Sequence, residues 1–304
     1  ATTVRWLWRG NQTLAESAGG KTPPVCSYEG SDYQASFWDQ GDRAYEDQAE
    51  AVALRRLLPP RGKLLLEVGA GAGRNTPRYA NFERVVVSDY SLTQLQQAQA
   101  RLGRSERYIY VAADVYRLPF AEGLFDAATM IRVLHHMAEP QRALQQVRRV
   151  LLLGAVFILE YANKQNLKAI LRYAMGKQRW NPFSLEPEEF AELNFDFHPH
   201  YIHSLLVENQ FTIQRKLTVS HFRIPFLKKI VPLKWLIGMD SVAQLTGNWW
   251  QLTPSVFVRS QAEGESIIAE SKTFFCCPEC GSVLLEETET AITCKSCSKV
   301  WNIQ

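Results

Sequence analysis

The chain has 304 residues, enough for one large domain and a small one, and its 46% hydrophobic and 21% charged residues are ordinary for a globular protein. The formal net charge of +3 is too small to demand a nucleic acid partner. No apolar run reaches the roughly 18 residues of a membrane span, and the apolar part of residues 1–10 is too short for a signal peptide. We therefore expect a cytoplasmic protein.

The N-terminal part of the chain divides into an arm and a helix. Residues 10–32 are rich in Gly, Ser, Thr and Pro, a composition typical of loops. Residues 45–58 predict a helix, which ends at Pro59-Pro60 because proline cannot continue a helix. We expect residues 1–44 to form an arm and cap.

A glycine loop follows a short apolar run. Residues 64–66 are leucines, Glu67 ends the run, and the next glycines alternate with alanine at Gly69, Gly71 and Gly73. This pattern predicts a buried strand, a loop that comes close to a ligand, and a helix start. Dinucleotide enzymes use G-x-G-x-x-G, whose third small position would be Arg74 here. A carboxylate before the loop instead suits the ammonium of S-adenosylmethionine (SAM). A tight turn without a ligand is the alternative.

Further strands and helices alternate after this loop. Strands are predicted over 84–89, 108–115, 125–132 and 155–161, and helices over 92–102 and 140–151. Alternation of this kind predicts a doubly wound parallel sheet, which binds ligands beyond the carboxyl ends of its strands. Asp89 ends one strand, where its carboxylate can accept ribose hydroxyls or cap the next helix.

The following region reads as a substrate half with an insertion. Helices are predicted over 163–175, 187–193 and 198–209, strands over 211–219 and 255–258, and an insertion over 221–250. Residues 211–239 contain no Asp or Glu, and basic residues interleave with apolar and aromatic ones, most densely over 222–237. Three interpretations stay open: an RNA surface, a helix lying on an anionic membrane, or ordinary packing with solvated lysines.

Four of the six cysteines form two C-x-x-C pairs separated by 13 residues. They are Cys277, Cys280, Cys294 and Cys297. Two such turns can complete a tetrahedron of thiolates, which predicts a structural zinc ribbon. Disulfides and a rubredoxin-like iron site are the alternatives. Cys26 and Cys276 are not expected to be ligands.

Residues 45–162 resemble the class I SAM-dependent methyltransferases, in the methyltransferase-11-like branch of small-molecule and quinone enzymes. The matching segments are 66–73, 88–91, 113–115, 118–120, 125–127 and 133–136. The resemblance implies an α/β fold with a doubly wound, mostly parallel, seven-stranded Rossmann-like sheet. One departure is that residues 150–155 stand where the family usually has a Lys/Arg-Pro-Gly-Gly turn.

The resemblance also implies a SAM site. The residues that it assigns to the cofactor are Glu67, Gly69, Ala70, Gly71, Gly73, Asp89, Tyr90, Asp114, Val115 and Arg132. Glu67 and the glycine loop would hold the methionine part, and Asp89 would hold the ribose. Tyr90 and residues 114–115 would surround the adenine, while Arg132 would lie near the methyl group.

The reaction expected from such a site is direct, in-line methyl transfer, in which the protein mainly aligns the reactants. No residue is a compelling general base, and His135 and Tyr161 are weak candidates. The His135-His136 pair is otherwise structural, and Tyr161 and Asn163 are candidate substrate contacts. Three aromatic residues either cover the methyl group or pack on the sheet: Tyr28, Tyr33 and Trp38.

The expected domains are an arm over 1–44, a methyltransferase domain over 45–262 with a substrate insertion over about 162–253, and a linker and zinc ribbon over 263–304. The ribbon resembles the small zinc-ribbon partner subunits of tRNA and protein methyltransferases, so it could also bind a protein partner. The expected acceptor is a small molecule or a lipid-like compound. The alternatives are an RNA methyltransferase that grips rRNA or tRNA with the ribbon and the basic insertion, and a non-catalytic scaffold.

Overall fold

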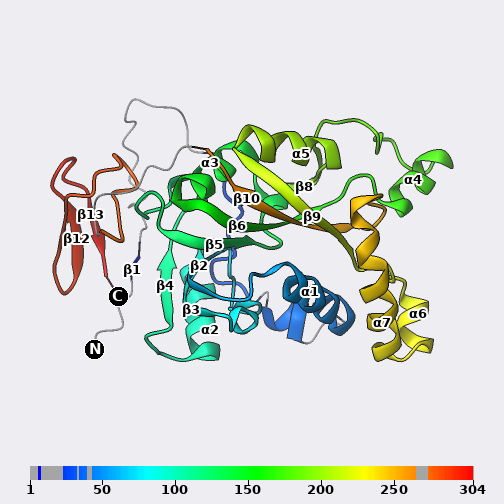
Figure 1. Cartoon of the computed structure of the whole chain (residues 1–304), viewed down its shortest axis with the longest axis horizontal. Coiled ribbons are helices and arrows are strands. Elements are labelled where there is room, and N and C mark those ends of the chain that lie inside the picture. The colour runs from blue at the N-terminus through cyan, green and yellow to red at the C-terminus, as the bar shows by residue number, and fades with distance from the viewer. Residues whose placement is uncertain (1–5, 8–22, 33, 40–42, 265–272, 304) are drawn as a thin grey trace.

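The structure is a computed structural model that describes residues 6–7, 23–32, 34–39, 43–264 and 273–303. Figure 1 shows a large sheet with helices on both of its faces and a small three-stranded unit at one end of the molecule. In the described part of the chain, no helix is both long and apolar enough to cross a membrane.

The large sheet has the strand order β1-β4-β3-β2-β5-β6-β10-β9. Its strands are β1 (Trp6–Leu7), β2 (Gly62–Val68), β3 (Phe82–Asp89), β4 (Tyr108–Ala112), β5 (Phe125–Met130), β6 (Leu151–Ala162), β9 (Phe211–Val219) and β10 (Ser255–Ala262). All neighbours from β1 to β6 are parallel, while β10 is antiparallel to both β6 and β9. The predicted seven-stranded, mostly parallel sheet is confirmed, and the two-residue β1 adds an eighth strand at its edge.

The helices cover the two faces in separate groups. They are α1 (Ala44–Leu57), α2 (Leu92–Leu102), α3 (Pro140–Val150), α4 (Leu167–Ala174), α5 (Pro199–Glu208), α6 (Pro225–Ile230) and α7 (Leu233–Ala243). Helices α1 and α2 pack apolar residues into one hydrophobic cluster with the sheet, and α3 and α5 pack into the other. Because both faces are buried, the central strands are nearly continuous apolar runs.

Two sequence expectations need correction. Residues 187–193 do not form a helix, because the hairpin of β7 (Glu188–Ala191) and β8 (Asn194–Asp196) turns there through Leu193 at φ +50°. A segment this short gains little from helical hydrogen bonds alone, whereas the hairpin leads into the fully buried Phe197. The strand predicted over 155–161 starts earlier, at Leu151 directly after α3, and its pairing with β5 is irregular near that start.

The small unit is an antiparallel sheet of β11 (Leu285–Glu287), β12 (Ala291–Cys294) and β13 (Val300–Asn302). A short connecting segment, residues 274–276, fastens it to the large domain, because the Ala121 amide donates to the Phe274 carbonyl (3.1 Å) and the Cys276 amide donates to the Pro119 carbonyl (3.0 Å). The rings of Phe274 and Phe275 pack on Phe120. The small unit therefore shares apolar core with the large domain.

Candidate functional site

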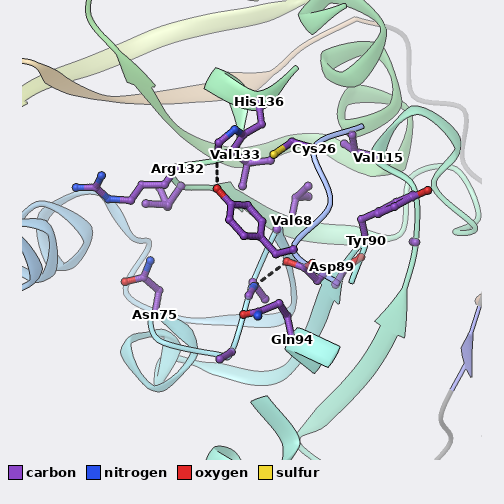
Figure 2. A pocket seen from close by; sticks show the side chains of 18 of the residues that line it. Cys26, Val68, Asn75, Asp89, Tyr90, Gln94, Val115, Arg132, Val133 and His136 are labelled. Carbon is purple, nitrogen blue, oxygen red and sulfur yellow. Dashed lines mark hydrogen bonds between the residues drawn. The ribbon is translucent and has the colours of Figure 1, made fainter. Parts of the chain in front are cut away.

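A cavity that is open to solvent lies at the carboxyl ends of β2, β3 and β5. This is the edge at which parallel α/β sheets bind ligands. Figure 2 shows Asp89, Tyr90, Arg132 and His136 around it. Seven of the ten predicted cofactor residues line the cavity: Gly69, Ala70, Gly71, Asp89, Tyr90, Val115 and Arg132. The predicted residues Glu67, Gly73 and Asp114 do not line it.

The glycine loop presents backbone to the cavity at one position and packs tightly at another. Gly71 has φ +55°, and a Cβ there would meet nothing closer than a Gln94 side-chain oxygen at 3.8 Å. The space beside it is therefore free for a ligand. Gly69 has φ +68°, and a Cβ there would lie 2.2 Å from Val133, so this position accepts only glycine.

Asp89 is tied to backbone amides on two sides. Gly71 N donates to its Oδ2 and Ser91 N donates to its Oδ1, each at 2.8 Å. Figure 2 marks the bond from the glycine loop. Burial raises the pKa of Asp89, and the amide bonds partly oppose that rise. A carboxylate offers about four lone-pair sites, so acceptor capacity remains for the two hydroxyls of a vicinal diol.

Glu67 lies behind the glycine loop instead of in the cavity. Thr76 Oγ1 donates to its Oε2 at 2.5 Å, and Tyr79 donates to the same carboxylate. Both partners belong to the 3₁₀ helix η2 (Thr76–Tyr79). Burial raises the pKa of Glu67 to about 7, against these hydrogen bonds. In this geometry Glu67 does not directly contact a ligand ammonium in the cavity.

Asp114 also has a local partner. Its carboxylate accepts the Tyr116 amide at 2.9 Å and so caps the 3₁₀ helix η3 (Val115–Arg117). Its neighbours in the chain, Ala113 and Val115, line the cavity with Leu118. This end of the cavity is apolar and suits a flat ring.

The opposite end is cationic and aromatic. Arg132 Nε donates to the buried Glu50 at 2.7 Å, and Arg74 donates to the same carboxylate at 2.7 Å. Burial acts to raise the pKa of Glu50, but Arg132 and Arg74 outweigh it and bring that pKa to about 2. Both guanidinium groups lie over the Trp38 ring, at 4.8 and 3.6 Å from its centroid. Arg132 has φ +59°, and its amide donates to Glu160 at 2.9 Å.

His136, not His135, faces the cavity. Its Nδ1 lies 3.1 Å from the Leu193 carbonyl and its Nε2 lies 3.1 Å from the Tyr28 hydroxyl. Because a carbonyl only accepts, Nδ1 carries the proton and Nε2 accepts from Tyr28. Burial lowers the pKa of His136, so the ring is neutral near pH 7. His135 is more deeply buried, and its pKa lies well below the usual value for that reason.

The other candidate substrate contacts lie away from the cavity. Tyr161 is fully buried in the apolar core, and burial raises its pKa. The Asn163 amide donates to the carbonyls of Gln251 and Thr253, both at 2.8 Å, so it holds two chain segments together. The geometry therefore does not support Tyr161 as a catalytic candidate or Asn163 as a substrate contact.

A segment of the N-terminal arm crosses the cavity. Val25 pairs with Met137 on one side. On the other side the Glu29 carboxylate accepts from the Leu92 amide (3.0 Å) and the Thr93 hydroxyl (2.7 Å) at the start of α2. Of the aromatic residues expected to cover the site, Tyr28 and Trp38 line the cavity, and Tyr33 lies outside the described residues.

Several lining residues were not anticipated from the sequence. Arg74, Asn75 and Gln94 all line the cavity. In the sequence, Arg74 stands out only because it breaks the dinucleotide pattern. Its position directly after the third glycine is the one local signal that it lies near a ligand.

The four cysteines of the C-x-x-C pairs meet in the small unit. Their Sγ atoms lie within 4.8 Å of one another, and the Cys277–Cys297 and Cys280–Cys294 pairs are each 3.6 Å apart. This separation is too long for a disulfide, whose sulfurs are about 2.05 Å apart. Four sulfurs at about 2.3 Å from a tetrahedral zinc ion would lie about 3.8 Å apart. The donor set therefore fits zinc.

Comparison with known proteins finds similarity in the segment that supplies most of the cavity lining. Residues 66–159 match a family model described as a methyltransferase domain. Over 115 residues the chain is 33% identical to a demethylmenaquinone methyltransferase of Clavibacter sepedonicus, covering 37% of this chain and 47% of the relative. Over 130 residues it is 29% identical to a 27-O-demethylrifamycin SV methyltransferase of Amycolatopsis mediterranei, covering 40% and 48%. The chain thus spans about half the length of these curated relatives.

Solved structures agree on the fold. A chain in the complex that contains the Haloferax volcanii Trm112 methyltransferase activator superposes with a TM-score of 0.54 at 14% identity, covering 76% of this chain and 96% of that one. The magnesium protoporphyrin IX methyltransferase of Synechocystis with bound S-adenosylhomocysteine (SAH) gives 0.50 at 16% identity, covering 74% and 88%. These structures share the fold of the chain, and residues 66–159 within that fold are the part that matches the methyltransferase domain model.

Proposed function

We propose that the protein transfers the methyl group of SAM to a small organic acceptor. The observation that carries this proposal is the Asp89 carboxylate, held by the Gly71 and Ser91 amides at the edge of the cavity. It is suited to accept both hydroxyls of a ribose. SAM itself supplies a methyl group that is already activated by the positive sulfur.

The residues that would hold the cofactor divide along the cavity. The apolar end at Val115 and Leu118 suits the adenine, and Tyr90 lies beside it. The free space at Gly71 suits the methionine backbone. The cationic end has Arg74 and Arg132, which favour a carboxylate there.

Tyr28 and His136 are the groups best arranged to move a proton from the acceptor. The Tyr28 hydroxyl donates to His136 Nε2, and the Leu193 carbonyl holds the other ring nitrogen. A hydroxyl of the acceptor can give its proton to Tyr28 Oη while the tyrosine proton moves to His136 Nε2. The low pKa of His136 keeps this nitrogen unprotonated at neutral pH.

A small acceptor is supported by the relatives and by the shape of the site. Two relatives are named for demethylmenaquinone and for 27-O-demethylrifamycin SV, which are small molecules. The lining near His136 is apolar, with Val25, Val133 and Met137. Such a lining suits the rings of a quinol or a phenol better than a charged polymer.

The four cysteines are proposed to hold a structural zinc ion in the small unit. They form a closed set of thiolates with no open position for substrate. The unit lies against its own methyltransferase domain through Phe274 and Phe275. One fold neighbour forms a complex with a methyltransferase activator, and by analogy the ribbon would be the built-in partner of this domain.

The proposal is tested by titrating the purified protein with SAH in a calorimeter, with NADH as the control nucleotide. Micromolar binding of SAH and no binding of NADH is the expected result. A panel of quinols, phenols and unmodified tRNA with radiolabelled SAM then identifies the acceptor class. Failure to bind SAH, or labelling of tRNA alone, would overturn the proposal.

A further inference from the structure

One end of the molecule exposes an unusual amount of apolar side chain. The exposed apolar residues of α4, α6, α7 and residues 249–252 are here called the apolar end. Its most prominent members are Leu171, Phe226, Ile230, Trp235, Trp249 and Trp250. Trp249 is 77% exposed and Phe226 is 67% exposed. Soluble proteins seldom leave aromatic side chains this exposed in a group unless the surface binds something.

The segments that carry the apolar end are joined through their backbones. Helix α7 leads directly into the 3₁₀ helix η5 (Gln244–Asn248), and the Trp250 amide donates to the Thr246 carbonyl at 3.1 Å. The Leu167 amide then donates to the Leu252 carbonyl at 2.8 Å, which joins the start of α4 to this segment. Figure 1 shows α4, α6 and α7 together at the end of the molecule opposite the small three-stranded unit.

The segments that carry the apolar end are basic. Residues 162–185 and 211–239 contain no Asp or Glu. Exposed basic side chains occur in both segments: Lys168, Arg172, Lys177, Arg179, Lys229 and Lys234. The acidic residue of α7, Asp240, is buried and accepts from His221 at 2.8 Å, so it does not offset this charge at the surface.

We propose that the apolar end docks on an anionic lipid bilayer. Exposed Trp and Phe suit the boundary between headgroups and acyl chains, and Lys and Arg around them suit lipid phosphates. Protein interfaces are depleted of lysine. RNA binding relies on basic and aromatic side chains and does not require exposed Leu, Ile and Val beside them. A membrane surface therefore explains both the exposed apolar residues and the basic residues around them.

The docking surface is one helix away from the cavity. Tyr45 of α1 donates to Asp240 of α7 at 2.9 Å, and Lys228 of α6 binds Glu46 of α1 at 3.1 Å. The same helix α1 carries Glu50, which holds Arg132 at the cavity. Docking would therefore bring the cavity close to lipophilic molecules in the bilayer. That last step rests on the proposed methyl transfer, whereas the docking itself does not.

The test is sedimentation of the full chain with vesicles of phosphatidylcholine alone and of phosphatidylcholine mixed with phosphatidylglycerol. We expect binding to the mixed vesicles to be about tenfold tighter or more, because each lysine near an anionic surface contributes about 1 kcal/mol. Tryptophan fluorescence should shift to the blue on binding. The Trp249→Ser, Trp250→Ser double variant should weaken binding at least severalfold, and Lys229→Gln with Lys234→Gln should remove the preference for anionic lipid.

A matched control removes exposed apolar side chains from the other end. Leu284 and Val300 are 62% and 56% exposed in the small unit, and the Leu284→Ser, Val300→Ser variant should sediment like the parent. All variants change exposed side chains, so thermal melting and SAH binding should stay unchanged; SAH binding separately reports the proposed methyltransferase site.

The docking proposal is overturned if the parent does not sediment with mixed vesicles, or if the control variant loses as much binding as the tryptophan variant. Salt-sensitive tRNA binding that the lysine variant abolishes, without vesicle binding, would assign the surface to RNA. A dimer that the tryptophan variant dissociates, again without vesicle binding, would assign it to a second copy of the chain.

Discussion

Asp89 is the residue on which the proposed cofactor site depends most. Replacing it with alanine removes an anionic acceptor, and a hydrogen bond to a charged group contributes about 1.5–3 kcal/mol. We expect Asp89→Ala to weaken SAH binding about tenfold to a hundredfold, measured by calorimetry.

Asp126 provides a matched control for that variant. It also accepts two backbone amides, from Lys63 at 3.1 Å and Leu64 at 2.8 Å, but it does not line the cavity. Asp126→Ala should lower the melting temperature about as much as Asp89→Ala and leave SAH affinity unchanged. Equal SAH affinity in the two variants would show that Asp89 does not bind the ribose.

Glu67 predicts a pH dependence of stability. Its pKa is about 7 in the folded protein and near its usual value of 4.5 in the unfolded chain. Because the folded pKa is raised, its contribution to stability is full below about pH 4.5 and is lost as the pH rises through 7. The free energy of unfolding of Glu67→Gln should therefore rise relative to that of the parent by about 3 kcal/mol between pH 4.5 and 8, as measured by denaturation at each pH. A constant difference would mean that Glu67 ionises normally.

At the scale of elements, the arm segment over the cavity has its own anchor. Glu29 accepts from three groups at the start of α2, the Ser91 and Thr93 hydroxyls and the Leu92 amide, and the helix dipole there also favours a carboxylate. Glu29→Gln should speed SAH dissociation severalfold in stopped-flow measurements while melting stays nearly constant. Glu208→Gln, at the end of α5, serves as the control. Unchanged dissociation in Glu29→Gln would mean that the segment does not retain the ligand.

The small unit should depend on its metal. Cys280→Ser removes one of four thiolates, so zinc content measured by emission spectroscopy should fall to near zero. The connecting segment 274–276 hydrogen-bonds to residues 119–121, next to Leu118 in the cavity wall. SAH affinity should therefore fall as well.

The neighbouring Cys276 gives the control for that experiment. Its thiol donates to the Phe120 carbonyl at 3.0 Å and does not belong to the metal cluster. A serine hydroxyl can make the same bond, so Cys276→Ser should keep its zinc and its SAH affinity. Full zinc content in Cys280→Ser would contradict the proposed ligand set.

Elements that are marked by a pattern within a short stretch of sequence can be predicted from the sequence. Apolar runs that end in an acidic residue identify β2 and β3, and the spacing of Cys277, Cys280, Cys294 and Cys297 is enough to predict that their thiols meet. The hairpin β7–β8 is a different case, because its acidic segment favours a helix until the packing of Phe197 is taken into account.

The cavity is harder to predict than the sheet. Tyr28 and His136 are 108 residues apart in the chain, and Arg74 meets Glu50 from a different element. Such pairs depend on tertiary contacts that no spacing in the sequence reveals. Tyr161 shows the opposite error: its place after an apolar run favours the site, but the alternation of strand β6 turns its side chain into the core.

At the scale of the whole molecule, the two domains share one core. Cys277, Ile292 and Trp301 of the small unit belong to the same apolar cluster as Phe120 and Phe125 of the large domain. Calorimetric unfolding should therefore show one cooperative transition, and a zinc chelator should lower its midpoint. Two separate transitions, with only the smaller one sensitive to chelator, would contradict this coupling.

The small unit and the methyltransferase domain belong to one polypeptide, and this has a consequence for regulation. Docking of two segments of one chain is independent of protein concentration, and its effective local concentration is on the order of millimolar. Dilution and changes in expression level cannot separate the pair, and their ratio is always one to one. The supply of the proposed zinc ion is then the variable that would control this contact in a cell, whereas an assembly of separate subunits would also respond to the abundance of each subunit.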